Sequence, residues 1–268
     1  MVSTLSLVFM VTTLAIVFLF PIILAVVFYR RHKFTWLAVL VGALVFLIFQ
    51  LLTRIPLLSM LGQMPWYQQM AQNIFLVALF LSFTAGLFEE VGRWLAFRFA
   101  LKGRWQTKSG VAYGIGHGGF EAIVLTGLAF VNNLVISLMI NTGQFDTAIA
   151  PQMGAMAETV RSQLVDTPSY MFLVGGLERV LAMTLHIALS LVVLNAVRLG
   201  KPLYLLYAIL IHTVANLGAV LLAQLPNGTL LAEGYLVVVA VLCFLYIRRE
   251  MKKPDPAAEP SLEASAAA

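Results

Sequence analysis

Seven long apolar runs constrain this chain more than any other feature of its sequence. Each run is typical of a membrane-spanning helix of about 20 residues or longer, the length that an α-helix needs to cross a hydrocarbon core of roughly 30 Å. Hydrophobic residues make up 61% of the 268 residues and charged residues only 11%, whereas a soluble domain carries about 25% charged residues. The sequence therefore predicts an all-α fold, a polytopic membrane helical bundle with about seven transmembrane helices.

The predicted spans are separated by polar loops. In chain order they are Leu5–Tyr29, Phe34–Leu58, Asn73–Leu101, Val111–Ile140, Tyr170–Val197, Leu203–Ala223 and Tyr235–Ile247. The last of them is short unless it begins near Leu230. A surface helix is expected around Met153–Leu164, and the Trp-Tyr pair in Leu61–Gln69 is typical of a segment at the membrane interface.

The distribution of Lys and Arg predicts the orientation in the membrane. If the seven predicted spans cross the membrane alternately, Arg54 and Arg161 fall on one side of the membrane, and Arg93 and Arg179 lie inside spans. The other thirteen of the 17 basic residues fall on the opposite side: Arg30, Arg31, Lys33, Arg98, Lys102, Arg104, Lys108, Arg198, Lys201, Arg248, Arg249, Lys252 and Lys253. By the positive-inside bias, the N-terminus is predicted outside and the C-terminus in the cytoplasm. We expect a multi-pass protein of the cell membrane, which in a bacterium is the plasma membrane.

A single membrane domain accounts for nearly the whole chain. We assign it to residues 1–253, with a motif-bearing core at 73–223. The tail, 254–268, is rich in Pro, Ala, Ser and Glu and is predicted to be disordered in the cytoplasm. The basic residues sit in short loops between spans, so they indicate topology and not a nucleic-acid partner.

Glu89, Glu90 and Arg93 are charged residues inside the third predicted span. By insertion scales, each charge near the middle of a span costs roughly 2.5–3.5 kcal/mol unless the protein compensates it. On a helix, Arg93 can pair with either glutamate, because the three residues are three and four positions apart. One arginine does not neutralise two carboxylates, so we expect further partners on other helices.

Three other spans place polar side chains at a similar depth. At about 1.5 Å per residue, His117 lies about 9 Å and Glu121 about 15 Å into the fourth span from its cytoplasmic start, and their spacing puts them on one helix face. The remaining members are Glu178, Arg179 and His186 in the fifth span and His212 and Asn216 in the sixth. The sequence therefore predicts one polar cluster, from about the middle of the membrane to its cytoplasmic side.

Acid–base activation of water is the chemistry that these residue types permit. A glutamate can hold a water whose proton a histidine shares, and His212 with Asn216 can donate hydrogen bonds to an oxyanion. This combination suits hydrolysis of a peptide bond within the membrane. No His-Glu-x-x-His pair occurs, but Glu89, His186 and His212 are of the types that bind zinc.

Four motifs carry a resemblance to a known family. They are Glu89-Glu90-x-x-Arg93, Gly116-His117-Gly118-Gly119-Phe120-Glu121, Glu178-Arg179 followed by His186, and His212-x-x-x-Asn216. In this order, over roughly Asn73–Ala223, the chain resembles the YhfC family, described as intramembrane proteases. That family is grouped with the PrsW proteases, the CAAX prenyl endopeptidases and the APH subunit of gamma-secretase.

The resemblance implies glutamate-dependent proteolysis of a membrane-embedded or membrane-associated peptide or protein. It implies Glu89 as the water-activating base and Glu90 as the partner of Arg93 or of another helix. His186 would assist the base, and His117 is the alternative, because the second motif differs from that of the prenyl endopeptidases. A glutamate-only mechanism needs no cofactor, whereas the family's description as metalloproteases implies a metal, with zinc the candidate.

Other interpretations of the polar cluster stay open from the sequence. The glutamates and Arg93 can form a structural ion-pair network, and Glu178 with Arg179 can hold Glu121 without taking part in chemistry. A proton-coupled transporter uses the same residue types, although no inverted repeat is evident. A non-catalytic scaffold or receptor is the third alternative.

Overall fold

The structure, a computed structural model, describes residues 1–255, and within this range the regular elements are all helical. Seven helical rods are long and apolar enough to cross a membrane. They are Thr4–His32, Trp36–Leu61, Ile74–Ala100, Thr107–Thr142, Ser169–Arg198, Leu203–Ala223 and Gly228–Glu250. The predicted all-α membrane bundle is confirmed.

Three of the rods contain a π-helical segment. The second rod joins α2 (Trp36–Val45) to α3 (Ile55–Leu61) through Phe46–Arg54, the third extends α5 (Ile74–Leu95) by Ala96–Ala100, and the fourth joins α6 (Thr107–Glu121) to α7 (Leu128–Thr142) through Ala122–Gly127. The other rods are α1 (Thr4–His32), α10 (Ser169–Arg198), α11 (Leu203–Ala223) and α12 (Gly228–Glu250). π-Helical turns are rare and frequently occur at functional sites.

Short helices lie outside the rods. They are α4 (Pro65–Ala71), α8 (Ala150–Met153) and α9 (Met156–Val165). Helix α9 matches the predicted surface helix, and α12 begins seven residues before the predicted seventh span, directly after Asn227 in the left-handed conformation. Of the tail predicted to be disordered, residues 256–268 lie outside the described part of the chain.

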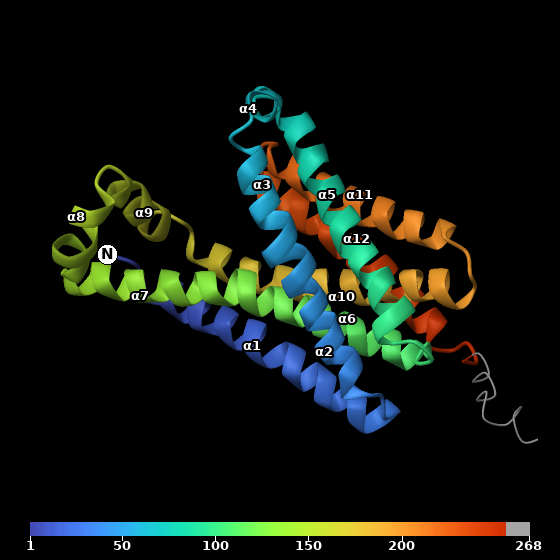
Figure 1. Cartoon of the computed structure of the whole chain (residues 1–268). Helices are drawn as coiled ribbons and strands as arrows, with labels where there is room; N and C mark the ends of the chain where they lie inside the picture. Colours follow the sequence, from blue (N-terminus) through green and yellow to red (C-terminus); the bar gives the residue numbers. More distant parts are fainter. Residues whose placement is uncertain (256–268) are drawn as a thin grey trace, which may run out of the picture.

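Helix α10 is the central element of the bundle. In its most apolar stretch 78% of the residues are buried, against 22% in α1 and 17% in α12. Figure 1 shows α10 running beside α1 and the α6–α7 rod, while α5 lies beside α11. Helix α10 also contacts α5 and α11. The four helices that carry the predicted polar residues are therefore neighbours in space.

Glycines bring α6 unusually close to the helices on either side. A Cβ added at Gly116 would lie 2.0 Å from the backbone oxygen of Val39 on α2, and one at Gly114 would lie 2.5 Å from the Cα of Ile187 on α10. Only hydrogen fits at these positions, so the glycines allow the helices to approach closely. His117 lies among these glycines, and its side chain is fully buried.

Candidate catalytic and metal site

Glu89 on α5 faces His117 on α6. The Nε2 atom of His117 lies 3.0 Å from Oε2 of Glu89, and both side chains are buried. The glycine contacts of α6 bring its backbone close enough for the histidine ring to reach α5. The ring is also packed edge-on against Phe46 of the π-helical segment in the second rod, which limits its rotation.

Glu121, one turn after His117, faces His186 on α10. The Nε2 atom of His186 lies 2.6 Å from Oε2 of Glu121, and Arg179 Nη1 donates to Oε1 of the same carboxylate at 3.4 Å. Arg179 also pairs with Glu178. The Nδ1 atom of His186 lies 3.9 Å from Oε2 of Glu89, so the two glutamate–histidine pairs adjoin.

These four side chains form one compact donor set from three helices. One possible ligand atom from each of Glu89, His117, Glu121 and His186 lies within 4.8 Å of all the others. Two imidazoles and two carboxylates match the ligands that zinc uses in proteins. Oε2 of Glu121 is buried without a well-aligned hydrogen bond, although His186 is 2.6 Å away. The Nε2 atom of His186 and Oε2 of Glu121 are close but are not aligned for a hydrogen bond. Two atoms in this relation can both be ligands of one cation, so the set fits a metal.

Glu90 belongs to a second, fully buried group behind this set. Its Oε2 lies 3.2 Å from Nη1 of Arg93, and its Oε1 lies 2.8 Å from Nδ1 of His212 on α11. Arg93 also donates from Nη1 to the backbone oxygen of His186, and its Nη2 contacts Nδ1 of that ring, each at 3.3 Å. The arginine therefore links α5 to α10 and fixes the position of His186.

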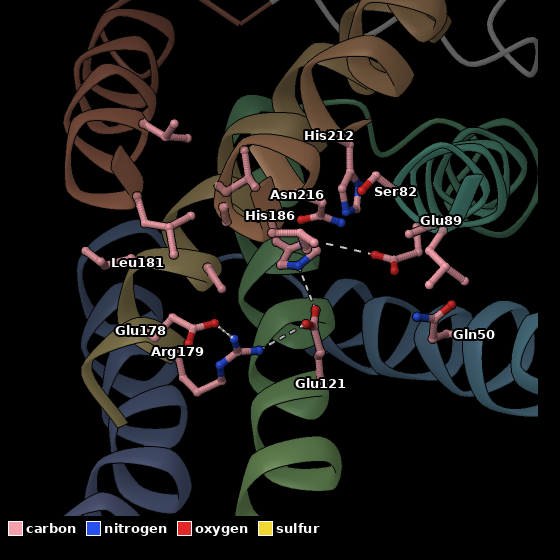
Figure 2. Close-up of a pocket in the computed structure, with 18 of the residues that line it drawn as sticks. Gln50, Ser82, Glu89, Glu121, Glu178, Arg179, Leu181, His186, His212 and Asn216 are labelled. Atoms are coloured by element: carbon pink, nitrogen blue, oxygen red, sulfur yellow. Dashed lines mark hydrogen bonds and ion pairs between the residues drawn. The ribbon is translucent and has the colours of Figure 1, made fainter. Parts of the chain in front are cut away.

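A cavity of about 340 Å³ opens beside the donor set. Figure 2 shows Glu89, Glu121 and His186 on its wall, with Asn216 and His212 next to them. The other polar residues that line it are Gln50, Arg54, Ser82, Glu178 and Arg179. A cavity with convergent polar groups inside a membrane domain is a candidate site for a bound molecule.

The structure brings the predicted site residues together in one region, but groups them differently for metal binding. The zinc set considered from the sequence was Glu89, His186 and His212. In the structure His212 pairs with Glu90, and the compact donor set contains His117 and Glu121 instead. Both His117 and His186 belong to this donor set, and which of them assists Glu89 stays a prediction.

Three polar lining residues, Gln50, Arg54 and Ser82, are absent from the predicted site. Arg54 was counted with the outer-side basic residues near the end of the predicted span Phe34–Leu58, and the structure places it within the second rod with its side chain buried. The sequence feature that could have revealed Gln50 and Arg54 is their spacing, because a Gln and an Arg four residues apart in an apolar run share a helix face.

Fold and site together define a multi-pass membrane protein with a buried histidine–carboxylate centre at an internal cavity. The chain belongs to the family described as YhfC intramembrane metalloprotease, whose sequence model matches residues 16–242. It is 38% identical over 223 residues to the "Uncharacterized membrane protein YhfC" of Bacillus subtilis (strain 168), an alignment that covers 82% of this chain and 86% of the relative. No solved structure shows a significant match. The predicted resemblance is confirmed.

Proposed function

We propose that the chain is an intramembrane endopeptidase that hydrolyses a peptide bond in or near the membrane. The observation that carries the proposal is the convergence of Glu89, His117, Glu121 and His186 within 4.8 Å beside the cavity. Membership of a family described as intramembrane metalloproteases supports the same reaction class.

His117, Glu121 and His186 are the residues that we propose to hold a metal, with zinc as the candidate. Catalytic zinc sites have three protein ligands and keep one position open, so one of the two glutamates is left for another role. When bound, the metal would polarise the scissile carbonyl and acidify a water. Both glutamates line the cavity, and Glu89 is our choice for the free carboxylate because it lacks the arginine contact that Glu121 has.

In this proposal Glu89 takes the proton of the attacking water and delivers it to the leaving amine. Asn216 donates its amide N–H to the developing oxyanion. His212 adds a second donor from Nε2 when it is doubly protonated, because its Nδ1 is engaged by Glu90. Arg93 and Arg179 act as positioning residues, through His186 and Glu121 respectively.

Comparative membrane proteomics tests the proposal in cells that make either the wild-type protein or Glu89→Gln. We expect proteins that are shortened in wild-type cells to persist at full length with the variant, with cleavage lowered by about 10²-fold or more, the usual contribution of a general base. Glu158→Gln on the exposed face of α9 is the matched control and should cleave normally. Full activity of a folded Glu89→Gln protein would contradict the proposal.

A further inference from the structure

Arg54 is a buried cation whose partners in the described residues are all neutral. Its side chain is 8% exposed. Nη2 donates to the backbone oxygen of Leu81 at 2.6 Å, Nη1 to Oε1 of Gln50 at 3.2 Å, and Nε to Oγ1 of Thr84 at 3.2 Å. Three of the five N–H donors of a guanidinium are thus used, and two remain.

The other arginines that are not exposed each have a carboxylate partner in the described part of the chain. Arg93 pairs with Glu90, Arg179 with Glu121, Arg198 with Glu250, and Arg161 with Asp146. An ionised side chain inside a membrane segment is costly, and such residues usually pair with each other or mark a functional pathway. Arg54 has no such pair in the described residues and Glu89 interacts with it only at longer range, so its two remaining N–H donors are available to an anionic ligand.

The position of Arg54 relates it to the proposed reaction centre. It lines the same cavity as Glu89. Its partners Thr84 and Leu81 precede Glu89 on α5 by five and eight residues, which is about 7–12 Å along a helix. An extended peptide advances about 3.3–3.6 Å per residue, so this separation corresponds to about two to four residues of a bound strand.

We infer that Arg54 binds a carboxylate of the peptide substrate, two to four residues from the bond that is cleaved. The carboxylate comes from an Asp or Glu side chain or from the C-terminus of the peptide. A guanidinium held by three neutral acceptors is oriented in advance and matches a carboxylate in charge and in geometry. The inference rests on the proposed endopeptidase function and adds to it a class of preferred substrate.

A peptide library in reconstituted vesicles tests the inference. Purified full-length protein in phosphatidylcholine vesicles, which contain no anionic lipid, is given membrane-spanning peptides with randomised positions, in free-acid and C-terminally amidated forms. Mass spectrometry locates the cleavage sites. We expect at least about 10-fold faster cleavage when a carboxylate lies two to four residues from the bond, because a hydrogen bond between two charged groups is stronger than one between neutral groups. The amidated peptides show whether the C-terminus or a side chain supplies it.

Substitutions of Arg54 separate recognition from a structural role. Arg54→Gln should remove the preference for a carboxylate, and Arg54→Glu should shift it toward Lys or Arg at the same position. Arg161→Gln, which changes an arginine of the surface helix α9, should leave the preference unchanged. An Arg54→Gln protein that cleaves every peptide more slowly by the same factor overturns the inference, because a purely structural link between rods would do that.

Two further results distinguish this inference from the proposed function. Glu89-dependent cleavage without any preference for carboxylates overturns the inference and leaves the function standing, whereas no Glu89-dependent cleavage of any peptide overturns both. If Arg54→Gln does not fold, Glu89→Gln protein provides the test, because it keeps Arg54. It should bind the preferred acidic peptide at least about 10-fold more tightly than the corresponding amide, and equal binding overturns the inference.

Discussion

At the scale of single residues, Glu89 and Glu90 are adjacent in sequence but have different surroundings. Successive residues on a helix point about 100° apart, so Glu89 reaches His117 and the cavity while Glu90 reaches Arg93 and His212. This separation gives each glutamate its own partners. It favours a reactive role for Glu89 and a positioning role for Glu90.

The proposed division between ligands and base predicts different metal contents for two similar variants. Glu121→Gln should lose most of the bound metal, because it removes a proposed ligand, whereas Glu89→Gln should keep the metal and lose cleavage. Elemental analysis of the purified full-length proteins measures both. Metal loss in Glu89→Gln with retention in Glu121→Gln would exchange the two roles, and a metal-free active wild type would indicate that glutamate alone activates the water.

The buried group of Glu90 and Arg93 predicts a large loss of stability when one partner is removed. Both side chains have no exposed surface, so Arg93→Met leaves the Glu90 carboxylate with His212 as its one close polar partner among the described residues and should lower the free energy of unfolding by about 3–5 kcal/mol. The double variant Glu90→Gln/Arg93→Met should recover part of this loss. Denaturation of the purified protein in detergent measures both, and equal stability of the single variant and the wild type would contradict the ion pair.

The residue contacts show which parts of the site were predictable from the sequence. Helical spacing gives the residues of one helix that can meet, such as Arg93 with either Glu89 or Glu90 and His117 with Glu121, and the structure pairs Arg93 with Glu90. It does not give the rotation of one helix against another, which decides that His117 contacts Glu89 and that His212 contacts Glu90. For this reason the sequence predicted the members of the cluster but not its donor set.

At the scale of elements, the closeness of α2 and α6 decides where His117 lies. Gly42 on α2 faces the backbone of Tyr113, and a Cβ there would lie 2.2 Å from its oxygen. Gly116 on α6 makes the reciprocal contact with Val39. The backbones of α2 and α6 are in direct contact. A movement of α6 away from α5 would therefore disrupt this packing.

This contact predicts that Gly116→Ala displaces α6. A methyl group 2.0 Å from a backbone oxygen cannot be accommodated by a side-chain movement, so the helices must separate and His117 must shift from Glu89. We expect lower thermal stability and a loss of cleavage of 10²-fold or so, as for other small misplacements of reacting groups.

Gly234→Ala on α12 is the matched control for this prediction. No atom lies within 4 Å of a Cβ added there, and alanine favours a helix by about 1 kcal/mol over glycine. The control should therefore be as stable as the wild type or more so. Normal activity of Gly116→Ala would contradict the role of the contact.

The elements themselves were largely predictable, because each membrane rod needs a long apolar run that is visible in the sequence. The start of α12 was left open between Tyr235 and about Leu230, because the run before Tyr235 contains polar residues, including Glu233, and the structure begins the helix at Gly228. The π-helical segments were not predictable either. They depend on tertiary packing, and one of them carries Arg54 inside the second rod.

At the scale of the whole molecule, the bundle has lipid-facing helices around a buried one. Large apolar side chains are exposed along α1 and α12, including Leu19, Ile22, Val238 and Leu242. Helix α10 is enclosed and carries Arg179 and His186 to the centre. The proposed reaction centre therefore lies inside the bundle, and the cavity beside it is the space that we propose for a substrate.

The distribution of basic residues predicts the orientation of the whole bundle. Seven rods put the two termini on opposite sides, and Lys and Arg favour the cytoplasmic side. Gly103 and Gly154 are exposed glycines with positive φ in turns on opposite sides of this arrangement, with no atom near a Cβ added at either. Both turns should therefore tolerate an inserted reporter.

Reporter fusions in bacterial cells measure this orientation. Alkaline phosphatase, which is active only outside the cytoplasm, should be active when inserted at Gly154 and inactive at Gly103, and a fluorescent protein fused after residue 268 should fluoresce in the cytoplasm. The opposite pattern would place the N-terminus in the cytoplasm. It would also place Arg54 on the cytoplasmic side of Glu89, because its partners Leu81 and Thr84 lie on the outer side of Glu89 only in the predicted orientation.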